Sequence, residues 1–459
     1  MRMKGWVSLV LLLAVAPSVL ASGILVYEQS ASASAQAGAV IARVDDPSAI
    51  FYNPAGIVFQ KGIQFSFNET YIYADVKYKS PTLGTYKDNA QNFFIPAVFV
   101  TYPLSDRITF GFAVTAPYNL ATDWSDDFPG RFASRHSKIV TLDYRPVVAF
   151  KINDHNAISV GLDWYDSELN LIRCVNSSAL STAINPHRLP SPPYPNAIPY
   201  YSESQVSVDT HLRDQALGFN LGYQYRNKPW SFGLFYHNRP TINYEGHTSF
   251  KVPPKLASLA NLFPGQDVAV DLNAVPASAR MGVAYAGDPL EVEFDVTWDQ
   301  WSSWGRSKAQ FSQHTDFYGT PVVKDEAFIF DWKDTYCFRL GFKYKLNDRV
   351  DLYWGALYDQ APVPDATRSP VLPDEDRWSL TIGTGWHKGH FAIDWYAMYL
   401  KFRQADVTAQ NIYRYGKTGL PLVIVPGFGQ VYPTNYPITP DGYYEGASLL
   451  CGITFTYKF

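Results

Sequence analysis

The chain has little charge, little cysteine and no long apolar run beyond its first residues. Asp, Glu, Lys and Arg make up 17% of the 459 residues, against about a quarter in a typical soluble protein. After Ala21 no apolar run reaches the roughly 18 residues of a membrane helix, which argues against a helical membrane protein. Cys174, Cys337 and Cys451 are scattered and odd in number. This spacing predicts neither a disulfide framework nor a metal site.

Basic runs and enzyme motifs are missing as well. The formal net charge is −4, and without a basic stretch we expect no nucleic-acid partner. The chain has no Gly-x-Ser-x-Gly elbow, no His-Glu-x-x-His motif and no phosphate-binding loop. We therefore expect no catalytic residue, no cofactor and no bound metal. A lipid hydrolase stays an alternative that lacks its catalytic residues.

Aromatic residues, in contrast, are abundant. The chain holds 32 Tyr, 29 Phe and 12 Trp, which together make up 16% of its residues. A soluble core does not need so many rings with a polar edge. A membrane β-barrel does, because Tyr and Trp settle at both lipid–water boundaries.

The first 21 residues have the pattern of an export signal. Arg2 and Lys4 precede an apolar stretch from Trp6 to Val15. Small side chains around Ala21 predict cleavage after that residue, so 1–21 is interpreted as a signal peptide. A true membrane helix is the alternative, which the short apolar stretch disfavours.

Many later segments alternate apolar and polar residues, the period of a two-faced strand. In Leu290–Asp299 one face is apolar and the other carries Glu291, Glu293, Asp295, Thr297 and Asp299. In a closed barrel such a polar face lines the interior. Glycine is frequent on the same face, which indicates an interior with contents and little room.

The connections between these segments alternate between short and long. Six tight turns are expected near 103–106, 153–156, 226–229, 287–289, 346–349 and 387–390, and seven long loops near 80–92, 118–135, 174–205, 251–266, 305–327, 363–375 and 406–442. Outer-membrane barrels have this asymmetry, with short periplasmic turns and long outer loops. The pattern predicts an all-β fold, a transmembrane antiparallel barrel of about 14 strands spanning residues 63–459.

The last strand ends on an aromatic residue. Phe459 shares its parity with Tyr457, Phe455, Ile453 and Cys451. This resembles the terminal strand that the outer-membrane assembly machinery reads, so that machinery is an expected partner.

Residues 22–62 have no strand period. They are rich in Ala, Ser and Gly, and 30–40 is compatible with short helices of small residues. The segment also carries apolar groups that need burial, such as Ile50, Phe51 and Ile57. We interpret 22–62 as a plug folded into the barrel lumen; the alternative is a disordered periplasmic tail.

A family resemblance rests on residues from Asp45 to Gly56, which read Asp-Asp-Pro-Ser-Ala-Ile-Phe-Tyr-Asn-Pro-Ala-Gly. The segment resembles the hatch signature of the FadL/TodX/OMPP1 family of outer-membrane transporters of hydrophobic compounds. Further matches follow in order at 102–107, 116–118, 298–302, 362–364 and 372–377. The resemblance implies a fourteen-stranded barrel in the Gram-negative outer membrane, blocked by an N-terminal hatch.

The resemblance also implies a route for the ligand. Family members take a hydrophobic ligand from outside and release it sideways near a kinked third strand. Asn53, Pro54 and Ala55 match the hatch tripeptide near that kink. Pro117 follows the predicted third strand and cannot donate to a ladder, so it is a candidate for the kink; an ordinary strand end is the alternative.

A fatty acid needs an apolar slot and a cation for its carboxylate. Arg173 ends the predicted fifth strand on the same face as Leu169 and Leu171, and Lys333 begins the predicted tenth strand on the inner face. Both positions resemble those of the basic pair in the fatty-acid carriers. An ion pair in the lumen or a solvated rim charge is the alternative for each.

Two outer loops carry further candidates. Leu256, Leu259, Leu262 and Phe263 have helical spacing and predict an apolar docking patch, or else the packing of one loop on another. Asp374-Glu375-Asp376 in another loop is interpreted as a solvated acidic run, with a divalent-ion site as the alternative.

The sequence thus predicts uptake of a hydrophobic molecule, most simply a long-chain fatty acid, by an outer-membrane protein surrounded by lipid. Monoaromatic hydrocarbons as substrates of the same fold are the nearest alternative, and a polar-solute porin is another. The resemblance implies a monomer.

Overall fold

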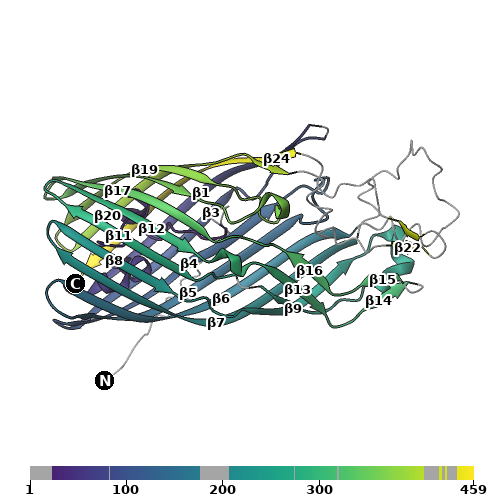
Figure 1. Cartoon of the computed structure of the whole chain (residues 1–459), viewed down its shortest axis with the longest axis horizontal. Helices are drawn as coiled ribbons and strands as arrows, with labels where there is room; N and C mark the ends of the chain where they lie inside the picture. The colour runs from purple at the N-terminus through teal and green to yellow at the C-terminus, as the bar shows by residue number, and fades with distance from the viewer. Residues whose placement is uncertain are drawn as a thin grey trace, which may run out of the picture.

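Fourteen antiparallel strands close into a barrel in the computed structural model (Figure 1), which confirms the predicted fold class. The structure describes residues 23–81, 83–175, 206–272, 274–317, 320–407, 423–425, 429–431 and 442–459. The barrel strands are β1 (Gln64–Ser80), β3 (Asn92–Ser105), β4 (Ile108–Asp123), β5 (His136–Lys151), β6 (Asn156–Val175), β7 (Val206–Asn227), β8 (Trp230–His237), β11 (Ser278–Ala286), β12 (Leu290–Asp299), β17 (Thr335–Asn347), β18 (Val350–Asp359), β19 (Arg377–Lys388), β20 (Phe391–Phe402) and β24 (Gly442–Lys458).

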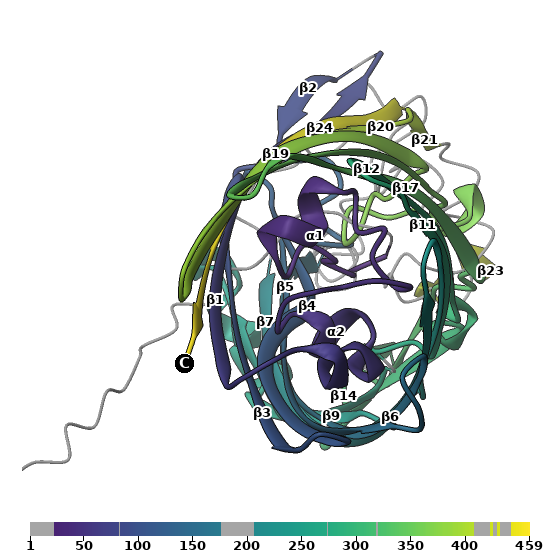
Figure 2. The same ribbon diagram turned by 90° about the vertical axis from the view of Figure 1, so that its left-hand side faces the viewer.

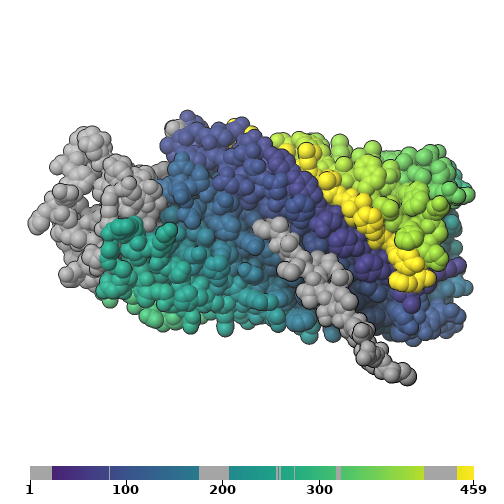
Figure 3. All heavy atoms as spheres, turned by 180° about the vertical axis from the view of Figure 1, so that it is seen from behind, coloured from purple at the N-terminus to yellow at the C-terminus, as the bar shows by residue number. Residues whose placement is uncertain are grey.

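The first and last strands form the seam of the barrel. Strand β1 pairs with β24 from Gln64 opposite Lys458 to Lys79 opposite Tyr443. Figure 3 shows the two strands side by side on the outer surface. Closure satisfies the backbone groups that an open edge would expose to lipid.

The two faces of the wall follow the predicted alternation. On β12 the ring of Phe294 is 44% exposed to the surroundings of the barrel, whereas Glu293, Asp295 and Asp299 are buried inside. A lipid-facing apolar surface and a polar interior are what a barrel in a bilayer requires. Among the described residues, no helix has both the length and the apolar character needed to cross a membrane.

The long connections add strands at the end of the barrel opposite the C-terminus (Figure 1). Strands β9 (Asn243–Lys251), β10 (Gln266–Asp271), β13 (Arg306–Phe311) and β16 (Glu326–Ile329) pair in this order and extend the wall from β7. Parts of the connections predicted near 251–266 and 305–327 are therefore strands. The smaller elements are β2 (Gly84–Lys87), β14 (Thr315–Phe317), β15 (Thr320–Val323), β21 (Ala405–Val407), β22 (Val423–Val425), β23 (Gly429–Val431) and the 3-10 turns η4 (Pro254–Leu262), η5 (Trp301–Ser303) and η6 (Asp365–Thr367). Most of the 174–205 connection and the predicted cleavage after Ala21 lie outside the described residues.

The N-terminal segment lies inside the ring of strands. Figure 2 shows α1 (Ala31–Ala35) and α2 (Ala49–Tyr52) within the barrel, and the 3-10 turn η1 (Pro54–Phe59) follows them. Wall glycines make room for this hatch: a Cβ on Gly355 would stand 2.7 Å from the carbonyl carbon of Gln36. Glycines predicted on the inner face of the barrel therefore lie where the hatch packs closely against the wall.

The Asn-Pro-Ala tripeptide is a buried turn of the hatch. The Asn53 side chain accepts from the N–H of Ala55 at 3.3 Å and donates to the carbonyls of Ile41 and Tyr223 at 2.9 and 3.0 Å. Pro54 occupies the first position of η1, where a missing N–H costs nothing. Asn53 thus caps η1 and ties the hatch to β7.

Candidate functional site

Along strand β6 the outward face changes from apolar to polar, and the inward face changes from polar to apolar. Its outward side chains change from Leu162 and Trp164, which are 50% and 46% exposed, to Asp166, which pairs with Arg213. On the inner face the change is opposite, from buried Asp163 to Leu169 and Leu171. The outer boundary of the membrane therefore falls near Trp164, since an aromatic ring marks the interface and a charged pair begins beyond it.

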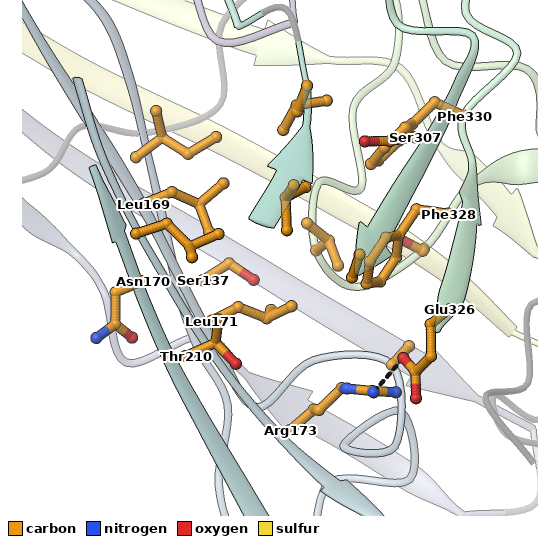
Figure 4. Close-up of a pocket in the computed structure, with 18 of the residues that line it drawn as sticks. Ser137, Leu169, Asn170, Leu171, Arg173, Thr210, Ser307, Glu326, Phe328 and Phe330 are labelled. Carbon is orange, nitrogen blue, oxygen red and sulfur yellow. Dashed lines mark hydrogen bonds and ion pairs between the residues drawn. The ribbon is translucent and has the colours of Figure 1, made fainter. Parts of the chain in front are cut away.

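Beyond this boundary the extended wall encloses an apolar cavity (Figure 4). Its walls come from β4, β5, β6, β7, β10, β13 and β16 and from the 368–371 segment. The apolar lining residues are Leu120, Phe132, Ala133, Ile139, Leu169, Leu171, Val208, Leu212, Val268, Val270, Leu272, Trp304, Ala309, Phe311, Ala327, Phe328, Ile329, Phe330, Pro370 and Val371. A concave apolar site with few polar groups is the usual form of a small-molecule site.

Arg173 reaches this cavity, on the inner face that the alternation of β6 predicts. Its guanidinium forms an ion pair with Glu326 at the start of β16, and the two side chains are 10% and 22% exposed. Figure 4 shows the pair at one end of the cavity. The cation is thus held beside an apolar wall, but an anion of the protein already accompanies it.

Lys333 does not lie with Arg173. It is exposed and does not belong to the residues that line the cavity. The reason is local: β17 begins only at Thr335, and Asp331 has a left-handed φ of 46°. Strand alternation therefore does not extend to Lys333, and the predicted pair of basic residues is not brought together.

The predicted docking patch is part of a loop cluster. Phe263 is buried against Val206 and Val323, and Leu262 packs on the same group. Of the candidates whose side chains the structure describes, Leu262 and Phe263 do not line the cavity, whereas Leu169 and Leu171 do. The side chains of Leu256 and Leu259 lie outside the described part of the chain. For Leu262 and Phe263 the alternative, packing of one loop on another, is what the structure shows.

The acidic run in the 363–376 connection is bonded within the protein, and its first residue is buried while the other two are partly exposed. Asp374 is fully buried and accepts from the N–H of Gly23 at 2.9 Å, and Glu375 pairs with Arg368 at 2.7 Å. Asp376 accepts from the hydroxyl of Tyr358 at 2.7 Å. Burial raises the pKa of Asp374 to about 8, and the carboxyl holds the start of the hatch through the hydrogen bond from Gly23.

The wall is interrupted between β3 and β4. The ladder between them runs only from Ser105 opposite Ile108 to Val98 opposite Val114. On its other side, the pairing of β4 with β5 shifts register between Thr115 and Tyr118. Pro117 lies in this shift, within β4 and not after it. Part of β4 therefore has no partner strand toward β3.

A segment of the hatch supplies backbone partners at this interruption. Leu25 forms an isolated bridge with Tyr118, the N–H of Val26 donates to the carbonyl of Pro117 at 2.7 Å, and that of Asn119 donates to Ile24 at 2.8 Å. Buried backbone groups need such partners. Residues 24–26 thus act as a short strand beside the kink.

This hatch strand adjoins the floor of the cavity. Leu120, which lines the cavity, follows Asn119 directly along β4. Trp301 covers the start of the hatch, since a Cβ on Gly23 would meet its ring at 2.7 Å. The ring of Trp301 contacts Trp304, a lining residue, at 6.1 Å between centroids. The cavity and the interruption therefore adjoin through Leu120 and through the Trp301–Trp304 ring contact.

The rest of the hatch is fixed by buried charges of the wall. Arg145 pairs with Asp143 at 2.7 Å and Asp163 at 2.6 Å, and donates to the carbonyl of Phe51 at 3.2 Å. On the far wall Asp295 accepts from the N–H of Ile41 at 3.0 Å. Such charge-assisted bonds are stronger than neutral ones in a dry interior.

Sequence reasoning missed Glu326 and the charged anchors of the hatch. Glu326 is 153 residues from Arg173 and belongs to a segment predicted as a loop, so no local pattern connects the two. Arg145 and Asp163 did carry a signal, since both are charged residues on inward positions of alternating strands.

A closed barrel with a lipid-facing belt, an internal hatch and an apolar outer cavity defines an outer-membrane transport protein for hydrophobic compounds. Residues 12–459 match the family model of outer membrane protein transport proteins (OMPP1/FadL/TodX). The chain belongs to this family and to the outer membrane of Gram-negative bacteria.

Individual relatives agree with this assignment. A long-chain fatty acid transport protein of Salmonella typhi is 26% identical over 357 residues, 74% of this chain and 78% of the relative. A 47 kDa outer membrane protein of Pasteurella multocida is 24% identical over 381 residues, 80% of this chain and 84% of the relative.

Solved structures share the fold. A FadL homologue of Pseudomonas aeruginosa superposes with a TM-score of 0.76 at 20% identity, over 95% of this chain and all of the other. The toluene transporter TodX of Pseudomonas putida gives 0.68 at 15% identity, over 95% of this chain and 99% of the other.

Proposed function

We propose that the protein takes up long-chain fatty acids, which bind in the apolar cavity at the outer end and leave sideways through the wall. The observation that carries the proposal is the position of the cavity. It lies beyond the membrane boundary, is lined by a buried arginine, and includes Leu120, which directly follows the part of β4 that pairs with the hatch strand at the interruption between β3 and β4. The motive force is diffusion down a gradient.

The cavity chemistry supports a ligand with a long apolar part and an acidic head. A fatty-acid tail gains about 0.8 kcal/mol for each CH₂ removed from water, and an arginine forms a strong bond with a carboxylate. Relatives named as long-chain fatty acid transport proteins support the same choice.

The exit step requires a small movement only. Residues 24–26 leave the kinked part of β4, while the anchored body of the hatch, held by Arg145 and Asp295, stays in place. Trp301 and Asp374 contact Gly23, just before this hatch strand. In the exit step they either move together with residues 24–26 or lose their contacts with Gly23. A ligand then passes from the cavity to the lipid without crossing the polar lumen.

Replacing Arg173 tests the binding role. The substitution Arg173→Gln removes the cation and leaves Glu326 facing an incoming carboxylate. We expect oleate uptake at low concentration to fall about tenfold, because a charge-assisted hydrogen bond contributes roughly 1.5–3 kcal/mol. The measurement is uptake of labelled oleate by cells that lack their own transporter and express the variant.

Lys333→Gln is the matched control, because it removes a cation that lies outside the cavity. It is expected to leave oleate uptake unchanged. Unchanged uptake in the Arg173 variant, with equal amounts of protein in the outer membrane, would contradict the assigned role of Arg173.

Small aromatic hydrocarbons are the second candidate substrate. The aromatic residues of the cavity, such as Phe328 and Trp304, favour it, and the structural neighbour TodX is described as a toluene transporter. Toluene needs no cation, so its uptake should not change in the Arg173 variant.

A further inference from the structure

The polar groups of the cavity are balanced before any ligand arrives. Arg173 is compensated by Glu326 within the cavity wall. Arg368, the second arginine of the lining, is bound by Asp365 at 2.8 Å and Glu375 at 2.7 Å. Lys138 belongs to the outward-facing set of β5, since the residues on either side of it are buried. Among the described lining residues, therefore, no inward cation is left without an anion.

A carboxylate ligand and an uncharged ligand therefore meet different sites. An uncharged chain fills the apolar space and leaves the pair intact. A carboxylate beside an intact pair gains little, because its attraction to Arg173 is offset by its repulsion from Glu326. It gains a full partner only when the Glu326 carboxylate moves away.

The position of Glu326 makes such an exchange possible. It is the first residue of β16, a strand of four residues whose described pairing is with β13 alone. Its side chain is more exposed than that of Arg173, 22% against 10%. Lys324, two residues earlier, is exposed at the same rim. The exchange replaces one carboxylate by another, so the arginine is never left buried without an anion, which would be costly.

We propose that Glu326 is a specificity-determining residue that competes with acidic ligands for Arg173. This inference rests on the proposed function, since it concerns how the same cavity selects its substrate. Glu326 lowers the affinity for carboxylates and leaves that for uncharged long-chain molecules unchanged. It also provides a release step, because its rebinding to Arg173 displaces the acid.

The test compares two ligands of equal chain length, oleate and oleyl alcohol. Binding of each is measured to purified protein in lipid nanodiscs, with protein-free discs as the blank. The substitution Glu326→Gln is expected to tighten oleate binding about tenfold, the value of one charge-assisted bond, and to change oleyl alcohol binding by less than about twofold. Asp325→Asn is the matched control. That carboxylate is the neighbour of Glu326 but pairs with Lys308 and His314 instead, so neither affinity should change.

Two further variants keep the test decisive. Arg173→Gln combined with Glu326→Gln removes both charges, leaves neither of them unpaired, and should bind oleate no more tightly than the unmodified protein. Tighter oleate binding in this double variant would overturn the inference whether or not the single variant folds. Oleate binding that is unchanged or weaker in Glu326→Gln, or a gain of equal size for both ligands, would overturn the inference. Absence of binding of either ligand to the unmodified protein and to every variant would instead refute the proposed function.

Discussion

A disulfide between positions 25 and 118 is expected to stop oleate uptake, and reduction is expected to restore it. Leu25 and Tyr118 face each other at the interruption of the wall, and the flanking hydrogen bonds make them a non-hydrogen-bonded antiparallel pair. The Cα atoms of such a pair are about 4.5 Å apart, within the range that a disulfide spans. The bond would fix the hatch strand to the kink.

The variant carries Leu25→Cys and Tyr118→Cys in a background with Cys174, Cys337 and Cys451 replaced by Ser. Uptake of labelled oleate is measured before and after a reductant. A second pair, Val98→Cys with Val114→Cys, is the matched control because it links β3 to β4 where they are already bonded. It should leave uptake unchanged. Full uptake with the first disulfide formed would exclude an exit that requires residues 24–26 to move.

The second large effect concerns the charges that hold the hatch. Arg145→Met removes the cation that pairs directly with Asp143 and Asp163, and all three side chains are at most 2% exposed. Removing one partner of a buried ion pair costs about 3–5 kcal/mol. We expect the hatch to detach from the wall while the strand ladders keep the barrel closed.

Conductance in planar bilayers measures this change directly. The unmodified protein should show little conductance, because the hatch fills the lumen, and Arg145→Met should open a large ion-conducting path. Adding Asp143→Asn and Asp163→Asn should reverse most of the effect, because the two carboxylates that lost Arg145 are then neutral. Low conductance together with an unchanged unfolding temperature in Arg145→Met would show that this network does not hold the hatch. High conductance of the unmodified protein would favour a polar-solute porin.

The barrel was predictable because its physics is local in sequence. The alternation in Leu290–Asp299, the tight turns and the aromatic last strand each report a wall between lipid and a polar interior. Even the inner glycines, which make room for the hatch at positions such as Gly355, could be read in this way.

The site was less predictable because its contacts are distant in sequence and partly outside regular strands. The alternation of inward and outward side chains placed Arg173 correctly on the inner face, since β6 is continuous up to that residue. It failed for Lys333, which precedes β17, and it gave no indication of Glu326. The buried residue Asp374 accepts a hydrogen bond from Gly23, at the other end of the chain, which no local pattern indicates.

The position of the kink at Pro117 was predicted, but the continuation of the strand beyond it was not. Pro117 was expected to follow its strand, whereas β4 continues to Asp123 beyond a register shift. The added length is possible because residues 24–26 of the hatch take the role of the missing neighbour. No pattern within β4 alone reveals that partner.

The most direct test of the central claim is uptake of labelled oleate and labelled toluene, side by side, by cells that lack their own transporter and express this protein. The cavity with its buried arginine predicts uptake of oleate that falls in Arg173→Gln. Uptake of toluene without oleate, unchanged in that variant, would contradict the claim and leave Arg173 and Glu326 as a structural pair in an aromatic-hydrocarbon channel.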